Sequence, residues 1–175
     1  MRKHIAIFDM DGTLVDSMYQ WKCAPANVLF QFGYQVTDED EQALNRLGFY
    51  HSPQYLIDRY ALPCTEEEFV NRCYELMLEE YHRFVLMRPN AKNYLLSLHE
   101  KGVQIAVLTA SRGAFVQAMA EKFGLQELID GVFSANDLNL EKSQPEIYRL
   151  LFDHFGCTGE ECLMFEDSAY ALETA

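Results

Sequence analysis

The chain has 175 residues, of which 49 % are apolar and 23 % charged, an ordinary globular composition that argues against intrinsic disorder. Its formal net charge of −13 argues against nucleic acid as a partner, because binding to a phosphate backbone needs a basic face. We expect no membrane association, because no stretch approaches the roughly 18 apolar residues of a membrane span. We also expect a cytoplasmic protein with reduced thiols, because the first apolar run is too short for a signal peptide and the five cysteines form no CxxC pair.

The first predicted element is a buried strand near the N-terminus. Residues 4–10, HIAIFDM, are a short apolar run that ends in acids, and Gly12 follows as a strand breaker. Such a run is typical of a parallel strand that is covered on both faces. We therefore expect the acidic residues at its end, Asp9 and Asp11, to carry a function.

Residues 17–88 show apolar positions at helical spacing and no convincing strand. Thr65 and Glu68 have the spacing of a capping box at the start of a long helix, and Ser52-Pro53 predicts another helix start. Pro25 lies inside an otherwise helical pattern, so we expect it to kink or split the first helix. The block is predicted to be a small all-helical domain.

After Pro89, helical and strand patterns alternate. Helices are expected over 91–101, 113–123 and 144–155, the last with Ser143 and Glu146 in capping-box spacing, and strands over 103–109, 131–136 and 162–167. This alternation implies a parallel sheet with right-handed crossovers. We predict an α/β fold in which residues 1–16 and 89–175 form a doubly wound, Rossmann-like core and residues 17–88 are inserted after its first strand. The pattern stops inside a helix that follows Asp167, so we expect the core to be truncated at its C-terminal end.

Polar residues stand at the carboxyl ends of all the predicted strands. They are Asp9 and Asp11 after the first strand, Thr109 after the second, Lys142 beyond the third, and Glu166 and Asp167 after the fourth. Ligands of an open parallel sheet bind beyond the carboxyl ends of its strands. We therefore expect these side chains to converge on one site.

The residue types suit phosphoryl transfer with Mg²⁺. Crowded carboxylates repel each other and resist ionising unless a divalent cation lies among them, and hard oxygen ligands favour Mg²⁺. A lysine and a hydroxyl suit phosphate oxygens, and a carboxylate can attack phosphorus to form an acyl phosphate. An EF-hand calcium loop is a poor alternative, because such a loop has glycine at its sixth position and Gly12 is the fourth residue from Asp9.

Four segments in order, FDMDGTLVDS, AVLTAS, EKSQPEIY and LMFEDS, resemble the four motifs of the haloacid dehalogenase-like hydrolase superfamily. The resemblance covers the whole chain, with the helical block 17–88 as a cap after the first motif. It implies that Asp9 is the nucleophile and a metal ligand. It also implies that Asp11 protonates the leaving group and then activates water, while its backbone carbonyl contacts the metal.

The same resemblance assigns the remaining motif residues. Thr109 and Lys142 would hold the phosphoryl group, and Asp167 would complete the Mg²⁺ site, with Glu166 helping directly or through water. Further contacts to the phosphate would come from the backbone amides near Met10, Asp11 and Ala110. One departure from the family pattern is Ala171, which replaces the glycine that usually follows the last motif; it is a mild change.

Asp11 narrows the reaction that the resemblance implies. Family members that cleave carbon–halogen or carbon–phosphorus bonds lack an acid two residues after the nucleophile. The resemblance therefore points to phosphate esters or phosphosugar transfer, and of these we expect a phosphatase, a phosphoric monoester hydrolase, that acts on a small phosphorylated metabolite.

Two other functions remain open at this stage. A hexose-phosphate mutase that resembles β-phosphoglucomutase would need a cap arginine, and the matching stretch LGFYHS offers His51 instead. A receiver-like phosphorylation switch would need another order of motifs. Ala110, Ser111, Arg112 and His51 are candidate substrate contacts, although Ser111 also suits a helix N-cap. The sequence leaves the oligomeric state open.

Overall fold

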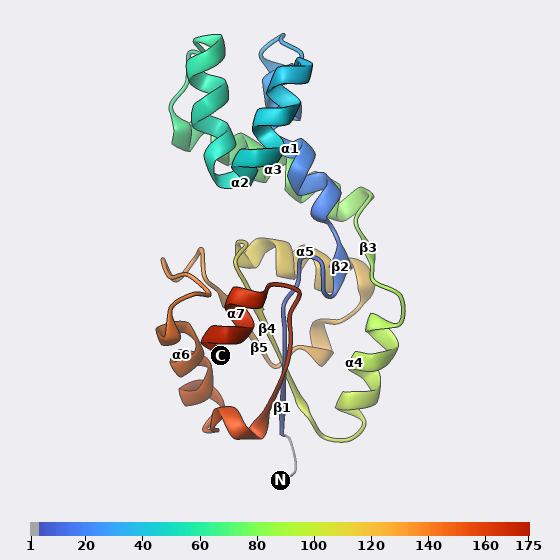
Figure 1. The fold of residues 1–175 in the computed structure, drawn as a ribbon. Helices are drawn as coiled ribbons and strands as arrows, with labels where there is room; N and C mark the ends of the chain where they lie inside the picture. The colour runs from blue at the N-terminus through green and yellow to red at the C-terminus, as the bar shows by residue number, and fades with distance from the viewer. Residues whose placement is uncertain (1–3) are drawn as a thin grey trace. The chain divides into compact units, whose positions relative to one another are not determined.

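A computed structural model describes residues 4–175, which divide into two compact units. One unit contains the described residues up to Asp16 together with Leu86–Ala175, and the other contains Ser17–Val85. The first is an α/β unit built on a parallel sheet, and the second is built of helices (Figure 1). No helix within residues 4–175 combines the length and the apolar character that a membrane crossing requires.

The sheet of the α/β unit has four parallel strands in the order β5–β4–β1–β6. They are β5 (Gly131–Ser134), β4 (Gln104–Thr109), β1 (Ile5–Phe8) and β6 (Cys162–Phe165). Phe8 of β1 lies opposite Val107 of β4 on one side and Phe165 of β6 on the other. Because all the strands run in the same direction, their carboxyl ends meet at one edge of the sheet.

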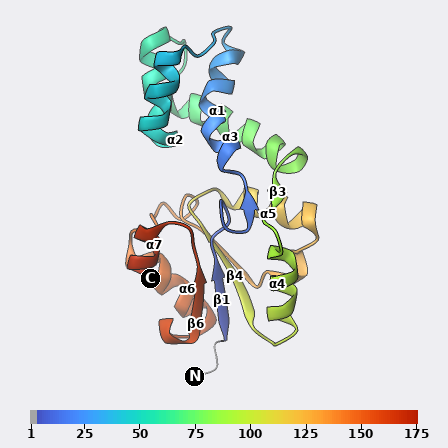
Figure 2. The ribbon, with the colours of Figure 1, turned by 45° about the vertical axis from the view of Figure 1, so that its right-hand side comes forward.

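Helices cover both faces of this sheet. The side chains of β1 alternate between the two faces, as the period of a strand requires. Ile7 faces α6, where it joins Ile147 in the main core cluster. Phe8 faces the other way, stacks on Phe165 with ring centroids 4.5 Å apart, and meets Tyr94 of α4 edge-on. Figure 2 shows α4 and α6 on opposite sides of the sheet. The helices of this unit are α4 (Ala91–His99), α5 (Gly113–Phe123), α6 (Pro145–Phe155) and α7 (Ala169–Thr174), with 3₁₀ turns at Gln126–Leu128 and Gly159–Glu161. The predicted doubly wound α/β fold is confirmed.

Two short strands flank the helical segment. β2 (Val15–Asp16) and β3 (Leu86–Met87) pair antiparallel, and the Arg88 amide donates a hydrogen bond to the Leu14 carbonyl at 2.9 Å. The segment therefore leaves and re-enters the α/β unit at adjacent positions.

The helical unit consists of α1 (Met18–Gln31), α2 (Asp38–Tyr60) and α3 (Glu66–Arg83). Buried Phe69, Cys73, Met77 and Tyr81 form the inner stripe of α3, at the i, i+4 spacing of an amphipathic helix. The predicted capping box of α3 is confirmed: the Glu68 amide donates to the Thr65 hydroxyl at 3.2 Å, and the Thr65 amide donates to the Glu68 carboxylate at 2.8 Å.

A buried carboxylate organises the start of α2. Asp40, at 0 % exposure, forms a second capping box with Thr37 and accepts hydrogen bonds from the Tyr55 and Tyr60 hydroxyls. The Arg59 Nε lies 2.6 Å from its Oδ1. Burial alone would raise the pKa of Asp40, but the hydrogen bonds from Tyr60, Thr37 and Tyr55 lower that pKa to about 2. This ionised group ties both ends of α2 together.

Of two local predictions in the helical unit, one is wrong and the other is wrong in part. α1 is continuous through Pro25, so the proline does not split the helix, and a kink at this residue stays a prediction. The proline removes one backbone hydrogen bond, but its ring is buried on the same stripe as Trp21 and Val28, and this packing holds the helix together. The break in α2 lies at Gly48, where φ is 67°, and not at Ser52-Pro53. The Ser52 hydroxyl instead donates to the Gly48 carbonyl at 2.6 Å.

Candidate active site

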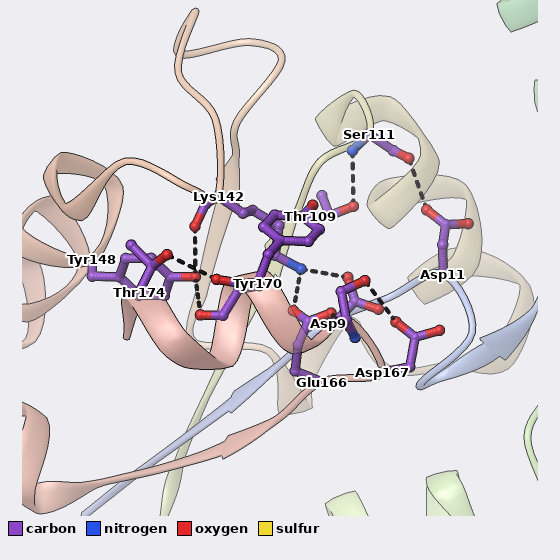
Figure 3. Close-up of polar contacts among 12 residues, drawn as sticks. Asp9, Asp11, Thr109, Ser111, Lys142, Tyr148, Glu166, Asp167, Tyr170 and Thr174 are labelled. Carbon is purple, nitrogen blue, oxygen red and sulfur yellow. Dashed lines mark hydrogen bonds and ion pairs between the residues drawn. The ribbon is translucent and has the colours of Figure 1, made fainter. Parts of the chain in front are cut away.

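Asp9 occupies the centre of the carboxyl edge of the sheet. It directly follows β1, is only 5 % exposed, and its amide donates to the Phe165 carbonyl at 2.9 Å. That bond continues the β1–β6 ladder, so the residues that follow β6, Glu166 and Asp167, come beside Asp9. Figure 3 shows the Asp9 and Glu166 side chains at the end of Lys142, with Asp167 near them.

Lys142 is buried at 3 % exposure and points its ammonium group into this edge. Its Nζ lies 2.8 Å from Asp9 Oδ1 and also forms an ion pair with Glu166. The hydroxyl of Tyr148 on α6 lies 3.0 Å from the Lys142 carbonyl and 2.9 Å from the Ala171 carbonyl. Tyr148 thus fastens the lysine loop to the last helix, a role that the sequence analysis missed.

The start of α6 differs from its predicted cap. Gln144, not Ser143, is the N-cap residue. The Ser143 hydroxyl donates to the Glu141 carboxylate at 2.8 Å, and the Gln144 side-chain oxygen accepts from the Glu141 amide at 3.0 Å. Pro145 in the first turn has no amide hydrogen and a helical φ, so this helix start depends less on a capping side chain.

The electrostatics of the cluster favour an added positive charge. The pKa of Asp9 is raised from its ordinary 3.8 to about 7: burial is the largest cause and the Glu166 and Asp11 charges add to it, while Lys142 offsets them only in part. Burial would lower the pKa of Lys142, but Asp9 and Glu166 outweigh this effect and raise it. The lysine therefore stays charged, and near neutral pH Asp9 is only partly ionised without another cation.

The same carboxylates fit a divalent metal ion. Oxygens of Asp9, Glu166 and Asp167 lie within 4.8 Å of one another. Asp9 Oδ2 is buried and has no hydrogen-bond partner within residues 4–175. Both oxygens of Glu166 are used, by the Lys142 ammonium and by the Ser168 amide at 3.1 Å. Asp9 and Asp167 are thus the groups best suited to bind a metal directly, and an all-oxygen set suits Mg²⁺.

Asp11 and Thr109 meet through the turn that follows β4. Gly12, with φ of 94°, allows the chain to turn sharply after Asp11. The Asp11 Oδ2 accepts a hydrogen bond from the Ser111 hydroxyl at 2.7 Å. The hydroxyl of Thr109, a residue at 1 % exposure, accepts from the Ser111 amide at 3.0 Å. The Asp11 carboxylate is thus directed toward Ser111, outside the acidic group around Asp9.

The structure places the other predicted residues as follows. Ala110 and Arg112 lie in the turn between β4 and α5, and Arg112, not Ser111, is the N-cap of α5. His51 is an exposed residue of α2 in the helical unit. One edge of the α/β unit therefore carries Asp9, Asp11, Thr109, Ser111, Lys142, Glu166 and Asp167.

Comparison with known proteins agrees with this geometry. The model of the haloacid dehalogenase-like hydrolase family matches residues 6–175. The fructose-1-phosphate phosphatase YqaB of Escherichia coli is 27 % identical over 176 residues, with 97 % of this chain and 89 % of the relative covered. The phosphoglycolate phosphatase of Aliivibrio fischeri is 26 % identical over 179 residues, with 96 % and 77 % covered. The crystal structure of CbbY from Rhodobacter sphaeroides in complex with phosphate shares the fold, with a TM-score of 0.79 at 21 % identity over 98 % of this chain and 80 % of that one.

Proposed function

The chain belongs to the haloacid dehalogenase-like hydrolases, and from this premise we propose that it is a Mg²⁺-dependent phosphatase of a small phosphorylated metabolite. Asp9 is the proposed nucleophile. The observation that carries the proposal is the buried Asp9–Lys142–Glu166 cluster, in which one carboxylate oxygen of Asp9 has no hydrogen-bond partner within the described residues. An unpartnered, buried carboxylate oxygen beside a charged lysine suits attack on a phosphoryl group.

In the first proposed step, an Asp9 oxygen forms a bond to phosphorus and the bond from phosphorus to the ester oxygen breaks. Asp11 gives its proton to that leaving oxygen. In the second step, Asp11 takes a proton from a water molecule, which attacks the same phosphorus and releases Asp9 and inorganic phosphate. Lys142 and Thr109 hold the phosphoryl oxygens in both steps, and Glu166 holds Lys142 in position.

Asp9 and Asp167 would hold Mg²⁺, with Glu166 next to them and the Asp11 carbonyl as a further contact. When bound, the metal would supply positive charge that favours ionised Asp9 and offsets charge on the transferring group. The raised pKa of Asp9 supports this requirement, since Lys142 alone does not keep Asp9 ionised near neutral pH.

The substrate class is proposed from the relatives. Two of them are named for hydrolysis of fructose 1-phosphate and of phosphoglycolate, which are small phosphate monoesters. We propose that residues 17–88 act as a cap domain that selects among such substrates, with His51 as a candidate contact. Arg112 and the backbone of Ala110 are candidate contacts in the core.

The test is Mg²⁺-dependent hydrolysis of p-nitrophenyl phosphate by the wild type and by Asp9→Asn. We expect hydrolysis that needs Mg²⁺ and is lost in Asp9→Asn. An exposed aspartate on α6 gives a matched control, because Asp153→Asn makes the same chemical change away from the site. Activity that survives Asp9→Asn would contradict the nucleophile. A folded, Mg²⁺-loaded wild type that releases no phosphate from any ester, but interconverts hexose phosphates, would overturn the phosphatase in favour of a mutase.

A further inference from the structure

The hydrogen bond between Ser111 and Asp11 joins the ends of two strands. Asp11 follows β1 and Ser111 follows β4, and the Ser111 hydroxyl donates to Asp11 Oδ2 at 2.7 Å (Figure 3). Asp11 lies on a sharp turn, so its side chain can rotate unless a neighbour holds it. A hydrogen bond from the Ser111 hydroxyl to one carboxyl oxygen restricts this rotation and leaves the other oxygen able to carry the proton.

The turn that carries Ser111 is itself braced. Its amide donates to the Thr109 hydroxyl at 3.0 Å, and its carbonyl accepts from the Ser134 hydroxyl at 2.8 Å. Ser134 ends β5 and is buried at 5 % exposure. The position of Ser111 is therefore fixed from both β4 and β5.

A second layer holds Ser134 and the start of α5. The Ser134 hydroxyl accepts from the Asp137 amide at 3.0 Å, and the Asp137 carboxylate accepts from the Gly113 amide at 2.8 Å. A Cβ on Gly113 would lie 2.9 Å from that carboxylate oxygen, so the close approach depends on glycine. Ser134, Asp137 and Gly113 thus form a bracket behind Ser111, none of them within the carboxylate cluster.

We infer that Ser111 is a positioning residue for Asp11: its hydroxyl, presented by a turn whose backbone Ser134 and Asp137 hold in place, keeps the Asp11 carboxyl group aimed for proton transfer to the leaving oxygen. This inference rests on the proposed function. The positioning role can be told apart from a direct contact between Ser111 and the substrate. Loss of a substrate contact would lower the hydrolysis rates of all esters of similar shape by the same factor. Loss of a positioning residue should instead lower the rate most for esters whose leaving oxygen most needs a proton.

The dependence of the rate on the leaving group separates these roles. p-Nitrophenolate leaves without a proton, whereas phenolate, a stronger base of nearly the same shape, benefits from an acid. The value of kcat/KM reports the steps up to transfer of the phosphoryl group to Asp9, which is the step in which the leaving group departs. Hydrolysis of the Asp9 intermediate, common to both substrates, does not enter this value.

The experiment compares kcat/KM for phenyl phosphate and p-nitrophenyl phosphate in the wild type and in Ser111→Ala. We expect a loss of about 10- to 100-fold on phenyl phosphate and less than about 3-fold on p-nitrophenyl phosphate, since general acid catalysis contributes about 10²- to 10⁴-fold. Ser111→Thr keeps a hydroxyl and should recover most of the loss. Ser134→Ala should show the same leaving-group signature at smaller size.

Two further variants guard against a merely structural effect. Ser97→Ala removes a serine hydroxyl that bonds only within α4, to the Tyr94 carbonyl, and should leave both rates unchanged. In an Asp11→Asn background, Ser111→Ala should cause no further leaving-group-dependent loss, because the acid that it positions is gone.

The measurements distinguish failure of the positioning role from failure of the proposed function. An equal loss on both esters, or a loss in Ser111→Ala that persists undiminished in the Asp11→Asn background, would overturn the positioning role while leaving the phosphatase intact. An active wild type with an unaffected, folded Ser111→Ala would also overturn it. A folded wild type that hydrolyses neither ester with Mg²⁺ would instead overturn the proposed function.

Discussion

Replacing Asp9, the proposed nucleophile, should stabilise the metal-free protein. Without a metal the pKa of Asp9 is about 7 in the folded chain, against an ordinary value of 3.8, mainly because the group is buried. The folded state therefore holds this proton more tightly than the unfolded state, and stability falls as the pH rises from the ordinary value through about 7. At about pH 8 the full difference corresponds to about 4 kcal/mol, at 1.36 kcal/mol for each pH unit between the two values.

Asp9→Asn resembles the protonated acid and removes most of this penalty. We expect a gain of about 2–4 kcal/mol at about pH 8 in EDTA, which for a chain of this size raises Tm by about 4–16 °C. At about pH 5 the gain should fall to less than half, because wild-type Asp9 is then largely protonated when folded. The assay is thermal unfolding at both pH values, with Asp153→Asn as the control.

Adding Mg²⁺ should reduce or reverse the difference in stability between the wild type and Asp9→Asn. Mg²⁺ at a hundredfold excess over Kd should stabilise the wild type by about 2.7 kcal/mol and raise its Tm, and Asp9→Asn should gain less because it lacks a ligand. If Asp9→Asn is no more stable than the wild type at about pH 8 in EDTA, the electrostatic account of Asp9 is wrong. A gain of equal size at both pH values would point to packing rather than charge.

Three other predictions follow from the contacts. Lys142→Met leaves the Asp9 and Glu166 carboxylates buried without their cation, so it should abolish hydrolysis and lower metal-free stability by about 3 kcal/mol, more at about pH 8 than at about pH 5, as measured by urea unfolding. Tyr148→Phe removes the hydroxyl that holds the lysine loop and should lower stability by about 1 kcal/mol with a several-fold loss of kcat/KM; unchanged values in both assays would contradict that role. Asp40→Asn should destabilise the helical unit by about 3 kcal/mol near neutral pH. Because the folded pKa of Asp40 is lowered to about 2, its contribution is present above 3.8 and is lost as the pH falls through about 2, so helical circular dichroism should show the two proteins converging in acid.

The sequence predicted the four strands of the parallel sheet, and hence the edge where the candidate site lies, because that information is local; the short strands β2 and β3 were not predicted, and β3 lies inside the block expected to be all-helical. Asp9, Thr109 and Asp167 each end an apolar run, and the parallel topology brings such ends together whatever the details of packing. The order of the strands and their register were not needed for this conclusion. The motif pattern then supplied roles for the same residues.

The supporting contacts could not be predicted because they depend on pairs far apart in the chain. Tyr148 reads as one more apolar position of a helix, and only the fold shows its hydroxyl between the Lys142 and Ala171 carbonyls. Ser134 and Asp137 look like ordinary residues at a strand end and in a loop. Their partners, Ser111 and Gly113, belong to another strand–helix connection.

At Pro25 the local preference of proline against helix interiors did not predict the observed structure. Proline inside a helix is disfavoured by its own geometry, yet α1 continues through Pro25, which is buried with the apolar residues of this helix. Ser52-Pro53 was predicted to begin a helix, but the break in α2 lies at Gly48, whose φ is positive. Local propensity is thus a guide that tertiary contacts can reverse.

The β2–β3 pair has a consequence for how such a chain can diversify. Asp16 and Leu86 lie opposite each other, so the backbone leaves the α/β unit and returns to it at adjacent positions. Everything between them can be lengthened, recombined or traded for another insert while the ladder of β1, β4, β5 and β6 keeps its register. The inserted sequence and the residues at the carboxyl edge of the sheet can therefore change separately, because the backbone enters and leaves the insert next to the β2–β3 pair.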